Sequence, residues 1–323
     1  MRWLIVFVLT LVAIGGLFWW AVLDTNAPPA TAHNIDLAAY RALVANDAPD
    51  TLPTDVRVEE VGSSTAPSFA ADAGDFSGDR TFSYVAYQVV APEGDTIIDA
   101  ALDASSLSQM TGGKGTFHPD VYARVLDAMT RAHRIMITHE HIDHVMAVAR
   151  HPQPAAIAPH LVLTRAQLDG LPRHAPNGVL APDIAALTPI DLTTPRRLAP
   201  GIVAHATPGH SPGSIVIYVR GATHEYLFIG DIVWAMAALE HDTGRPRFIR
   251  WLMSGVDPDR PAVLAQVRML HAIAAANPDL IILPAHDHAY LQQRVREGVV
   301  HEGFLAATPV SDRANGESAG SRP

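Results

Sequence analysis

The sequence contains no cysteine and a single lysine, Lys114, among its 323 residues. The absence of cysteine excludes a disulfide-stabilised scaffold, a thiolate metal site and a cysteine nucleophile. Acidic residues outnumber basic ones by 33 to 23, which gives a formal net charge of −10. Because contacts to phosphates supply most of the affinity for nucleic acids, this charge argues against a nucleic-acid partner. The residue type that is unusually frequent is histidine, with 17 copies.

An uncharged apolar segment occupies the N-terminus, from Trp3 to Leu23. As a helix it would be about 31 Å long, close to the thickness of the hydrocarbon core of a bilayer. Arg2 precedes the segment and no Lys or Arg follows until Arg41, so the positive-inside rule predicts a cytoplasmic N-terminus. We therefore expect a transmembrane anchor over residues 1–23, with the rest of the chain exported to the periplasmic side of a bacterial membrane.

A cleaved signal peptide is the alternative for this segment. Ala30-Thr31-Ala32 has the small-x-small pattern of a cleavage site. The apolar stretch, however, exceeds the usual length of about 7 to 15 residues, which favours the uncleaved anchor. With cleavage, the chain would instead be secreted to the periplasm, and an oxidising compartment suits a chain without thiols in either case.

Composition and periodicity divide the remainder into three parts. Residues 24–55 are rich in Ala, Pro and Asp, and predict a linker with one short helix over 35–44. Over residues 56–306, apolar runs of strand length alternate with helical stretches, which predicts an α/β domain. Residues 307–323 are small and polar and predict a disordered tail. The first elements expected in the domain are strands at 56–61, 81–90 and 96–100 and a helix at 118–132.

Four apolar runs of strand length each lead into residues of the kinds that bind metals. The runs and the residues that follow them are 134–138 before His139, His141, Asp143 and His144, 201–207 before His210, 226–230 before Asp231, and 280–285 before His286. Side chains at the ends of strands can converge on one point while the strands provide a rigid base. Imidazole and carboxylate groups suit zinc, and also iron and manganese.

The spacing within the first group supports a metal site. His139 and His141 would point about 200° apart on a helix, but in an extended turn both imidazoles can face one ion. Asp143 and His144 then begin the next helix and can reach a second ion. Chance produces this four-residue pattern at roughly one in 10⁵ starting positions, so a metal site is favoured over ordinary surface or core histidines.

Two acidic neighbours of these residues have expected roles. Glu140 lies between two histidines, and because neighbours in an extended turn point apart, we expect a solvated side chain rather than a general base. Asp287 follows His286, and ligating imidazoles usually donate their other N–H to a carboxylate or a carbonyl. We therefore expect Asp287, rather than His288, to be the hydrogen-bond partner of a ligand.

Four motifs in succession resemble the metal motifs of the metallo-β-lactamase superfamily. They are Thr-His-Glu-His-Ile-Asp-His at 138–144, Thr-Pro-Gly-His-Ser-Pro-Gly-Ser at 207–214, Ile-Gly-Asp at 229–231 and Pro-Ala-His-Asp at 284–287. The resemblance covers about residues 56–306. It implies an αββα sandwich, in which two mixed sheets lie back to back with helices outside and two zinc ions, or iron or manganese, at one edge.

The resemblance also implies which residues hold each ion. The first ion would be held by His139, His141 and His210, the second by Asp143, His144 and His286, and Asp231 would bridge the two. In having both Asp143 and Asp231, the sequence resembles glyoxalase II, the acyl-homoserine lactonases and the RNase Z-type phosphodiesterases. Most β-lactam hydrolases of the superfamily lack the bridging Asp, which makes antibiotic hydrolysis a weaker expectation.

This resemblance implies a dinuclear metallo-hydrolase acting on an ester, thioester or lactone. A hydroxide held between the metals would attack the carbonyl, with Asp143 orienting it or handling its proton. The alternatives are a small-molecule phosphodiesterase, a mononuclear iron sulfur dioxygenase and a β-lactamase. A metal-stabilised binding module is disfavoured because structural zinc sites are closed by four ligands.

Two segments are expected to shape the pocket for a small-molecule substrate. Residues 103–117 contain several Gly and Ser residues with little periodicity, which predicts a mobile loop over the site. Residues 232–260 hold aromatic and arginine side chains that would suit an acyl or aromatic substrate with a negative group. Packing of these aromatics onto the sandwich is the alternative. Trp234, three residues after Asp231, is the candidate substrate-binding residue.

Overall fold

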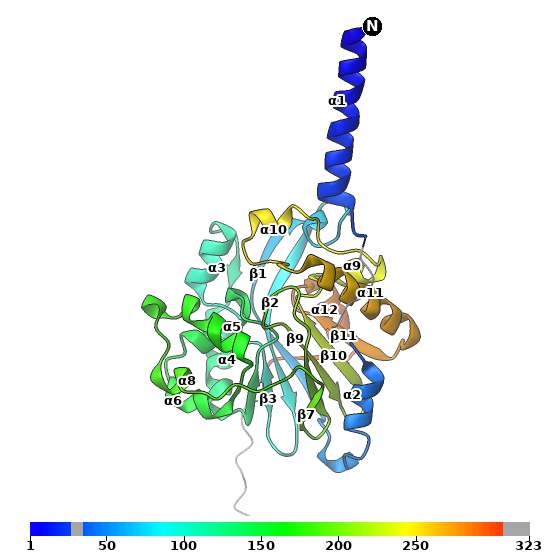
Figure 1. The fold of residues 1–323 in the computed structure, drawn as a ribbon. Coiled ribbons are helices and arrows are strands. Elements are labelled where there is room, and N and C mark those ends of the chain that lie inside the picture. Colours follow the sequence, from blue (N-terminus) through cyan, green and yellow to red (C-terminus); the bar gives the residue numbers. More distant parts are fainter. Residues whose placement is uncertain (27–34, 306–323) are drawn as a thin grey trace, which may run out of the picture.

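The chain folds into four layers, in which two β-sheets lie face to face and helices cover their outer faces (Figure 1). This computed structural model describes residues 1–26 and 35–305. The αββα arrangement expected from the resemblance is therefore confirmed. Its importance for the site is that loops from both sheets meet at one edge of the sandwich.

The first sheet has the strand order β12-β1-β2-β3-β5-β6, and β4 pairs with β1 beside the longer ladder. β1 and β2 are antiparallel, whereas β3, β5 and β6 run parallel to one another. The strands are β1 (Asp55–Pro67), β2 (Asp79–Val90), β3 (Thr96–Ile98), β4 (Thr116–Phe117), β5 (Arg134–Met136), β6 (Leu161–Val162) and β12 (His301–Glu302).

The second sheet has the strand order β11-β10-β9-β8-β7. β10 and β11 are parallel, and the other neighbours are antiparallel. The strands are β7 (Arg196–Ala199), β8 (Ile202–Ala206), β9 (Ile215–Arg220), β10 (Glu225–Gly230) and β11 (Leu280–Pro284).

The helices flank the sheets on both sides. Arg260–Ala276 (α11) packs on the second sheet, and the helices between residues 104 and 185 pack on the first. The remaining bounds are α1 (Arg2–Phe18), α2 (Leu37–Leu43), α3 (Ala104–Thr111), α4 (Pro119–Arg131), α5 (Ile142–Ala149), α6 (Pro154–Ile157), α7 (Arg165–Gly170), α8 (Pro182–Ala185), α9 (Met236–Glu240), α10 (Ile249–Leu252) and α12 (His288–Arg296).

The central strands are apolar on both faces because both faces are covered. In β2, Val85, Tyr87 and Val89 point between the sheets, and Tyr84 and Ala86 point toward the helices. Successive side chains of a strand alternate between faces, so a strand buried on both sides reads as a continuous apolar run. This explains why the expected strands at 56–61, 81–90 and 96–100 are found as β1, β2 and β3, and the expected helix at 118–132 as α4.

The expectation that residues 103–117 form a loop was wrong, whereas the expectation that they shape the pocket is confirmed, because Met110, Thr111 and Lys114 line the cavity beside the ligands. The segment forms α3 and β4. Asp103 caps the helix, because its side chain accepts a hydrogen bond from the backbone N–H of Ser106 at 2.8 Å. Leu107 is buried against the first sheet and holds the helix in place.

The segment expected as a linker contributes to the core. In α2, Leu37 and Tyr40 are buried, and they pack on the outer face of the second sheet with Ile35 and Val44. The hydroxyl group of Tyr40 lies 2.8 Å from Nδ1 of His205 in β8. The short helix is thus present, and it is packed on the sheet.

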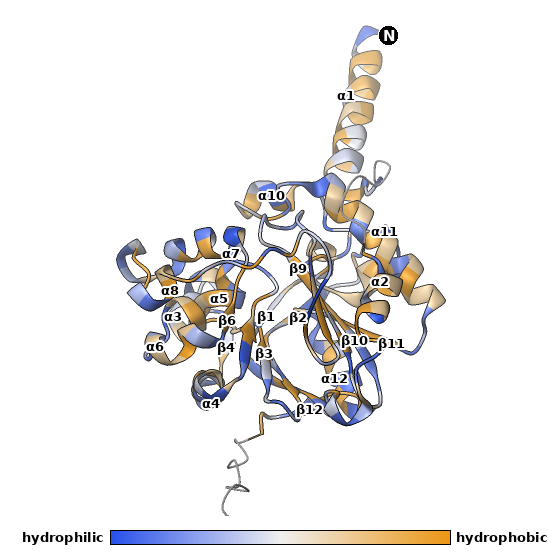
Figure 2. Cartoon of the chain, turned by 60° about the horizontal axis from the view of Figure 1, so that its bottom comes forward, coloured by the Kyte–Doolittle hydropathy of each residue, from blue (hydrophilic) through white to orange (hydrophobic). Residues whose placement is uncertain are grey.

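The N-terminal helix stands out from the domain. Among the described residues, Arg2–Leu23 is the one helical stretch that is long and apolar enough to cross a membrane. None of the α1 side chains is buried, and Figure 2 shows a largely apolar helix that projects from the domain. The structure contains no membrane, so the anchor and its alternative, the signal peptide, stay predictions.

The domain division made from the sequence, with boundaries after residues 23, 55 and 306, also stays a prediction. β1 begins at Asp55, close to the expected start of the domain. The tail expected to be disordered, 307–323, lies outside the described residues.

The packing of α2 predicts a large effect of truncating Tyr40. We expect Tyr40→Ala to lower the free energy of unfolding by about 3 kcal/mol or more, because a fully buried aromatic side chain is removed. Chemical denaturation of the full chain measures this. Leu43→Ala, in the same helix but exposed, is the control and should cost less than about 1 kcal/mol. Equal, small effects of both variants would show that α2 is a detachable linker.

Candidate metal centre

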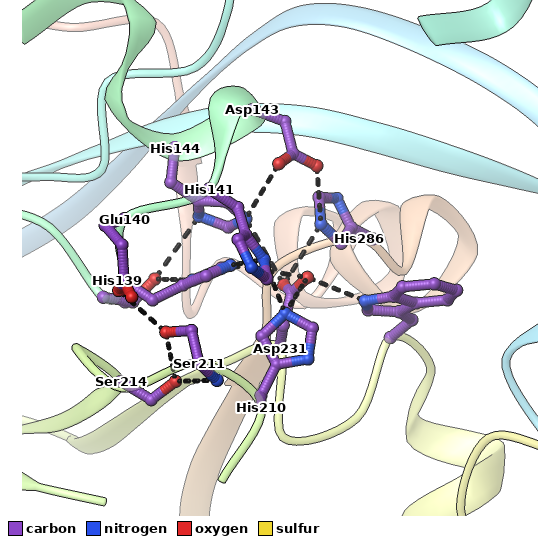
Figure 3. Close-up of polar contacts among 12 residues, drawn as sticks. His139, Glu140, His141, Asp143, His144, His210, Ser211, Ser214, Asp231 and His286 are labelled. Carbon is purple, nitrogen blue, oxygen red and sulfur yellow. Dashed lines mark hydrogen bonds and ion pairs between the residues drawn. The ribbon is translucent and has the colours of Figure 1, made fainter. Parts of the chain in front are cut away.

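Loops from both sheets deliver the predicted ligands to one edge of the sandwich. The turn after β5 carries His139 and His141, and the helix that follows, α5, carries Asp143 and His144. His141 directly precedes α5 and is in an extended conformation. His210 lies in the loop between β8 and β9, whereas Asp231 and His286 follow the parallel strands β10 and β11. Figure 3 shows that these side chains converge, as the sequence pattern predicted.

Three histidine nitrogens meet at a first point. Nδ1 of His141 lies 3.0 Å from Nε2 of His139 and 2.9 Å from Nε2 of His210. Ligands of a tetrahedral zinc ion with bonds of about 2.0–2.1 Å lie about 3.3 Å apart. The spacing of the three nitrogens is close to that value, so these histidines could hold one ion.

A second group lies beside the first and consists of His144 and His286 around the carboxylate of Asp143. Nε2 of His286 lies 3.3 Å from Oδ2 of Asp143. Nε2 of His144 lies 3.9 Å from Oδ1 of the same carboxylate. Both histidines are buried, and Asp143 is only partly exposed, at the base of the cavity described below.

Asp231 lies between the two groups. Its Oδ1 faces the second group, 3.3 Å from Nε2 of His144 and 3.1 Å from Nε2 of His286. Its Oδ2 faces the first group, 3.3 Å from Nε2 of His210 and 3.8 Å from Nε2 of His139. One carboxylate thus offers one oxygen to each set of nitrogens, which is the geometry of a bridging ligand.

The chemistry of the donor set fits two divalent cations. Nε2 of His144 and Oδ1 of Asp231 are buried and have no hydrogen-bond partner among the described residues, which is costly unless another group satisfies them. Burial and then His210 lower the pKa of His141 to about 3, which favours the neutral imidazole that binds metals. Burial opposes charge on His144 too, but Asp99 and Asp231 hold its pKa well above the usual value. The second position therefore favours a positive charge.

Asp99 orients His144 and was not identified from the sequence. Its Oδ2 lies 3.0 Å from Nδ1 of His144, so the imidazole can donate to it and turn Nε2 toward the site. Its Oδ1 accepts hydrogen bonds from the backbone N–H of Thr138 at 2.7 Å and from the Thr138 hydroxyl at 3.0 Å. The only sequence signal was an Asp at the end of an apolar strand.

Asp257 orients His210, and no spacing pattern in the sequence indicated this role. Its Oδ1 lies 2.9 Å from Nδ1 of His210, and the buried Arg245 donates to both of its oxygens. Burial favours the neutral carboxyl, but the charge of Arg245 and the bond with His210 hold the pKa of Asp257 at about 2. Arg245, one of the arginines in the segment 232–260 that was expected to suit a negative substrate group, is therefore engaged in an internal ion pair.

The role expected for Asp287 was wrong. Nδ1 of His286 donates instead to the backbone carbonyl of Ser83 in β2, at 2.8 Å. The Asp287 carboxylate accepts hydrogen bonds from the backbone N–H of Tyr290 at 3.1 Å and of Met236 at 2.9 Å. It caps α12, because the first N–H groups of a helix lack partners within the helix.

The expectation that Glu140 is solvated was also wrong. The side chain points away from the ligands, as the extended turn requires, but it enters a buried space beside the loop that carries His210. Its Oε2 accepts hydrogen bonds from the Ser211 hydroxyl at 2.8 Å and from the Gly213 backbone N–H at 3.1 Å. A Cβ atom on Gly213 would lie 2.4 Å from this oxygen, so glycine permits the contact. Glu140 thus links the turn that carries His139 and His141 to the loop that carries His210.

A cavity of about 390 Å³ opens above the second group. Its lining includes Asp143, Trp234 and His286. The Trp234 ring N–H donates to Oδ2 of Asp231 at 2.7 Å. Trp234 therefore both lines the cavity and holds the carboxylate of Asp231, and its expected contact with substrate stays a prediction. The other lining residues are Ser64, Thr65, Ala66, Ala70, Phe82, Tyr84, Met110, Thr111, Lys114, Ile249 and Met253.

Comparison with curated proteins finds two partial relatives, both named hydroxyacylglutathione hydrolase. The protein from Pseudomonas savastanoi pv. phaseolicola is 37% identical over 120 residues, which cover 37% of each chain. The protein from Pseudomonas syringae pv. syringae is 30% identical over 155 residues, which cover 45% of this chain and 54% of the relative. The chain thus matches about half or less of their length. No family model matches the sequence.

Solved structures match over a larger part of the chain. An N-acyl homoserine lactone hydrolase with its product bound at the catalytic metal center has a TM-score of 0.55 at 14% identity, over 75% of this chain and 96% of that one. A probable metal-dependent hydrolase from Staphylococcus aureus has a TM-score of 0.55 at 12% identity, over 73% and 90%.

The chain has the metallo-β-lactamase fold. The clustered residues lie where this metallo-β-lactamase fold was expected to hold its metals, at one edge of the sandwich. The sequence pattern predicted every residue of the cluster. It did not predict Asp99 and Asp257, which hydrogen-bond to the imidazole rings of His144 and His210.

The hydrogen bond between Asp257 and His210 predicts a metal-affinity effect. We expect Asp257→Asn to weaken binding of the ion held by His139, His141 and His210 by about 10- to 100-fold, because the His210 imidazole loses its anionic partner. Zinc titration against a competing chelator measures this. Asp279→Asn, an exposed carboxylate elsewhere, should leave the affinity unchanged. Unaltered zinc affinity in Asp257→Asn would contradict the positioning role.

Proposed function

We propose that this chain is a dinuclear zinc-dependent hydrolase of an ester, thioester or lactone carbonyl in a small molecule. The observation that carries the proposal is Asp231, whose two oxygens face two separate groups of histidine nitrogens. Asp143 and His286 of the second group line an open cavity, through which a substrate can reach them. Iron or manganese suits the same ligands.

The residues of the site would have separate roles in such a reaction. Two divalent cations bound there supply an activated water nucleophile near neutral pH and polarise the carbonyl oxygen. Asp143 is the catalytic carboxylate, because it lies at the cavity base, where it can orient that water and accept its proton. Burial raises the pKa of Tyr84, which lines the cavity, so its hydroxyl group stays protonated and can donate a hydrogen bond.

The preference for a carbonyl substrate rests on two supports. The cavity walls are mostly apolar, with Lys114 as the one lysine or arginine among the described lining residues, which suits an acyl group better than a polyanion. The partial relatives are named hydroxyacylglutathione hydrolase, and structural neighbours are named lactone hydrolases. The acidic net charge argues against a polynucleotide.

The proposal also includes attachment to a membrane. The stretch Arg2–Leu23 has the length and composition of a membrane span. With the N-terminus in the cytoplasm, the hydrolase domain would lie on the periplasmic side of a bacterial membrane, anchored there, or released if the segment is cleaved.

A panel of chromogenic reporters tests the reaction class. We expect the full chain in detergent to hydrolyse a lactone or thioester reporter, to lose this activity with a chelator and to regain it with zinc. Hydrolysis of the phosphodiester or β-lactam reporter alone would contradict the carbonyl-ester assignment and support the corresponding alternative. Oxygen consumption with a persulfide substrate and one iron per chain would identify a sulfur dioxygenase instead.

Removal of the bridging carboxylate is expected to affect metal content and turnover together. Asp231→Ala should lose at least one ion per chain and reduce kcat by about 100-fold or more, because both groups lose a ligand. Elemental analysis and reporter kinetics on the same samples measure this. Asp169→Ala, an exposed carboxylate on α7, is the control. Full activity of Asp231→Ala with two ions bound would contradict the bridging role.

A further inference from the structure

Exposed apolar side chains gather at the end of the domain from which α1 emerges. We call Phe76, Trp251, Leu252 and Met253 the apolar patch. Their exposed fractions are 58%, 60%, 72% and 40%. Outside the N-terminal helix, few other large apolar side chains of the described residues are exposed, and these lie apart from one another along the chain. Exposed apolar residues that cluster mark a surface that is covered in use.

The base of the N-terminal helix is joined to this patch. The rings of Trp20 and Trp251 are 5.5 Å apart, and those of Phe18 and Phe76 are 6.4 Å apart. Directly after the apolar segment, Asp24 pairs with Arg247 at 2.8 Å. These contacts fix where the apolar segment meets the domain. If α1 spans a bilayer, the patch must lie at the same membrane surface.

The patch borders the cavity above the metal centre. Met253 belongs to both, and Ile249 in α10 lines the cavity two residues before Trp251. Met110 and Thr111, at the end of α3, also line the cavity. In Figure 1, α3 and α10 both lie at the end of the domain nearest α1. The cavity therefore leads from the side of the molecule that carries the patch to the histidine cluster.

We propose that the apolar patch rests on the lipid bilayer and that the cavity takes its substrate from it. The substrate class is an amphiphile in which a hydrocarbon chain is joined to the hydrolysable carbonyl. The chain would lie along Met110, Ile249 and Met253, and the carbonyl would reach the base of the cavity beside Asp143. The continuity of the patch with the apolar helix selects a bilayer as its occupant. This inference rests on the proposed hydrolase function and names its substrate.

Site-directed spin labelling tests the membrane contact without using activity. Because the chain has no cysteine, Leu252→Cys and Val179→Cys each create a single labelling site. Val179 is 71% exposed, like Leu252, but lies outside the patch. In vesicles of phosphatidylcholine and phosphatidylglycerol, we expect the label at 252 to be accessible to oxygen and protected from a water-soluble nickel chelate. The label at 179 should show the opposite behaviour.

Equal nickel accessibility at the two sites would overturn the proposal. Protection at 252 that persists in detergent, with spin–spin broadening between chains, would show that a second copy covers the patch and would also overturn it.

Hydrolysis of an ester in vesicles and of a soluble ester tests whether the substrate enters the cavity from the bilayer. Leu252→Glu should hydrolyse a long-chain ester in vesicles about tenfold or more slowly than the wild type, because a charge replaces an apolar membrane contact. It should hydrolyse a soluble short-chain ester at the wild-type rate, and Val179→Glu should be unchanged on both. Equal rates of Leu252→Glu and wild type in vesicles would overturn the membrane route. No turnover of either ester by the wild type would instead refute the proposed function.

Discussion

The position of Asp231 is the constraint on which the rest of the site depends. Its buried carboxylate offers one oxygen to each of two groups of histidine nitrogens. So many ionisable groups can be buried together only if opposite charge compensates them. Nε2 of His144 and Oδ1 of Asp231 have no hydrogen-bond partner among the described residues, and bound cations would satisfy both atoms. Trp234 then fixes the carboxylate from the cavity side.

The sandwich gives this carboxylate fixed neighbours. Parallel strands β10 and β11 end side by side, so Asp231 and His286 lie close together, and the turn after β5 in the other sheet completes the cluster. The rings of His144, His210 and His286 are each held from behind by a hydrogen bond, and Glu140 holds together the two loops that carry the first three histidines. The strands thus fix the ends of the loops that build the site, and Met253 lines the cavity beside it and also belongs to the apolar patch near the base of α1.

Sequence reasoning succeeded where the signal was local. The spacing from His139 to His144 and the apolar strands before each ligand sufficed to find the cluster, and the resemblance supplied the layers. It failed where partners are distant, because Asp99 meets His144 across 45 residues and Asp257 meets His210 across 47. Burial of Glu140 depends on another loop folding against it. Helix α3 was also missed, although its Asp103 cap is a local signal in the sequence.

We propose that the site holds two cations. Elemental mass spectrometry of the purified full chain measures its metal content. We expect two divalent ions per chain, with zinc as the proposed metal. One iron per chain, or no bound metal after purification without chelators and dialysis against zinc, would contradict it.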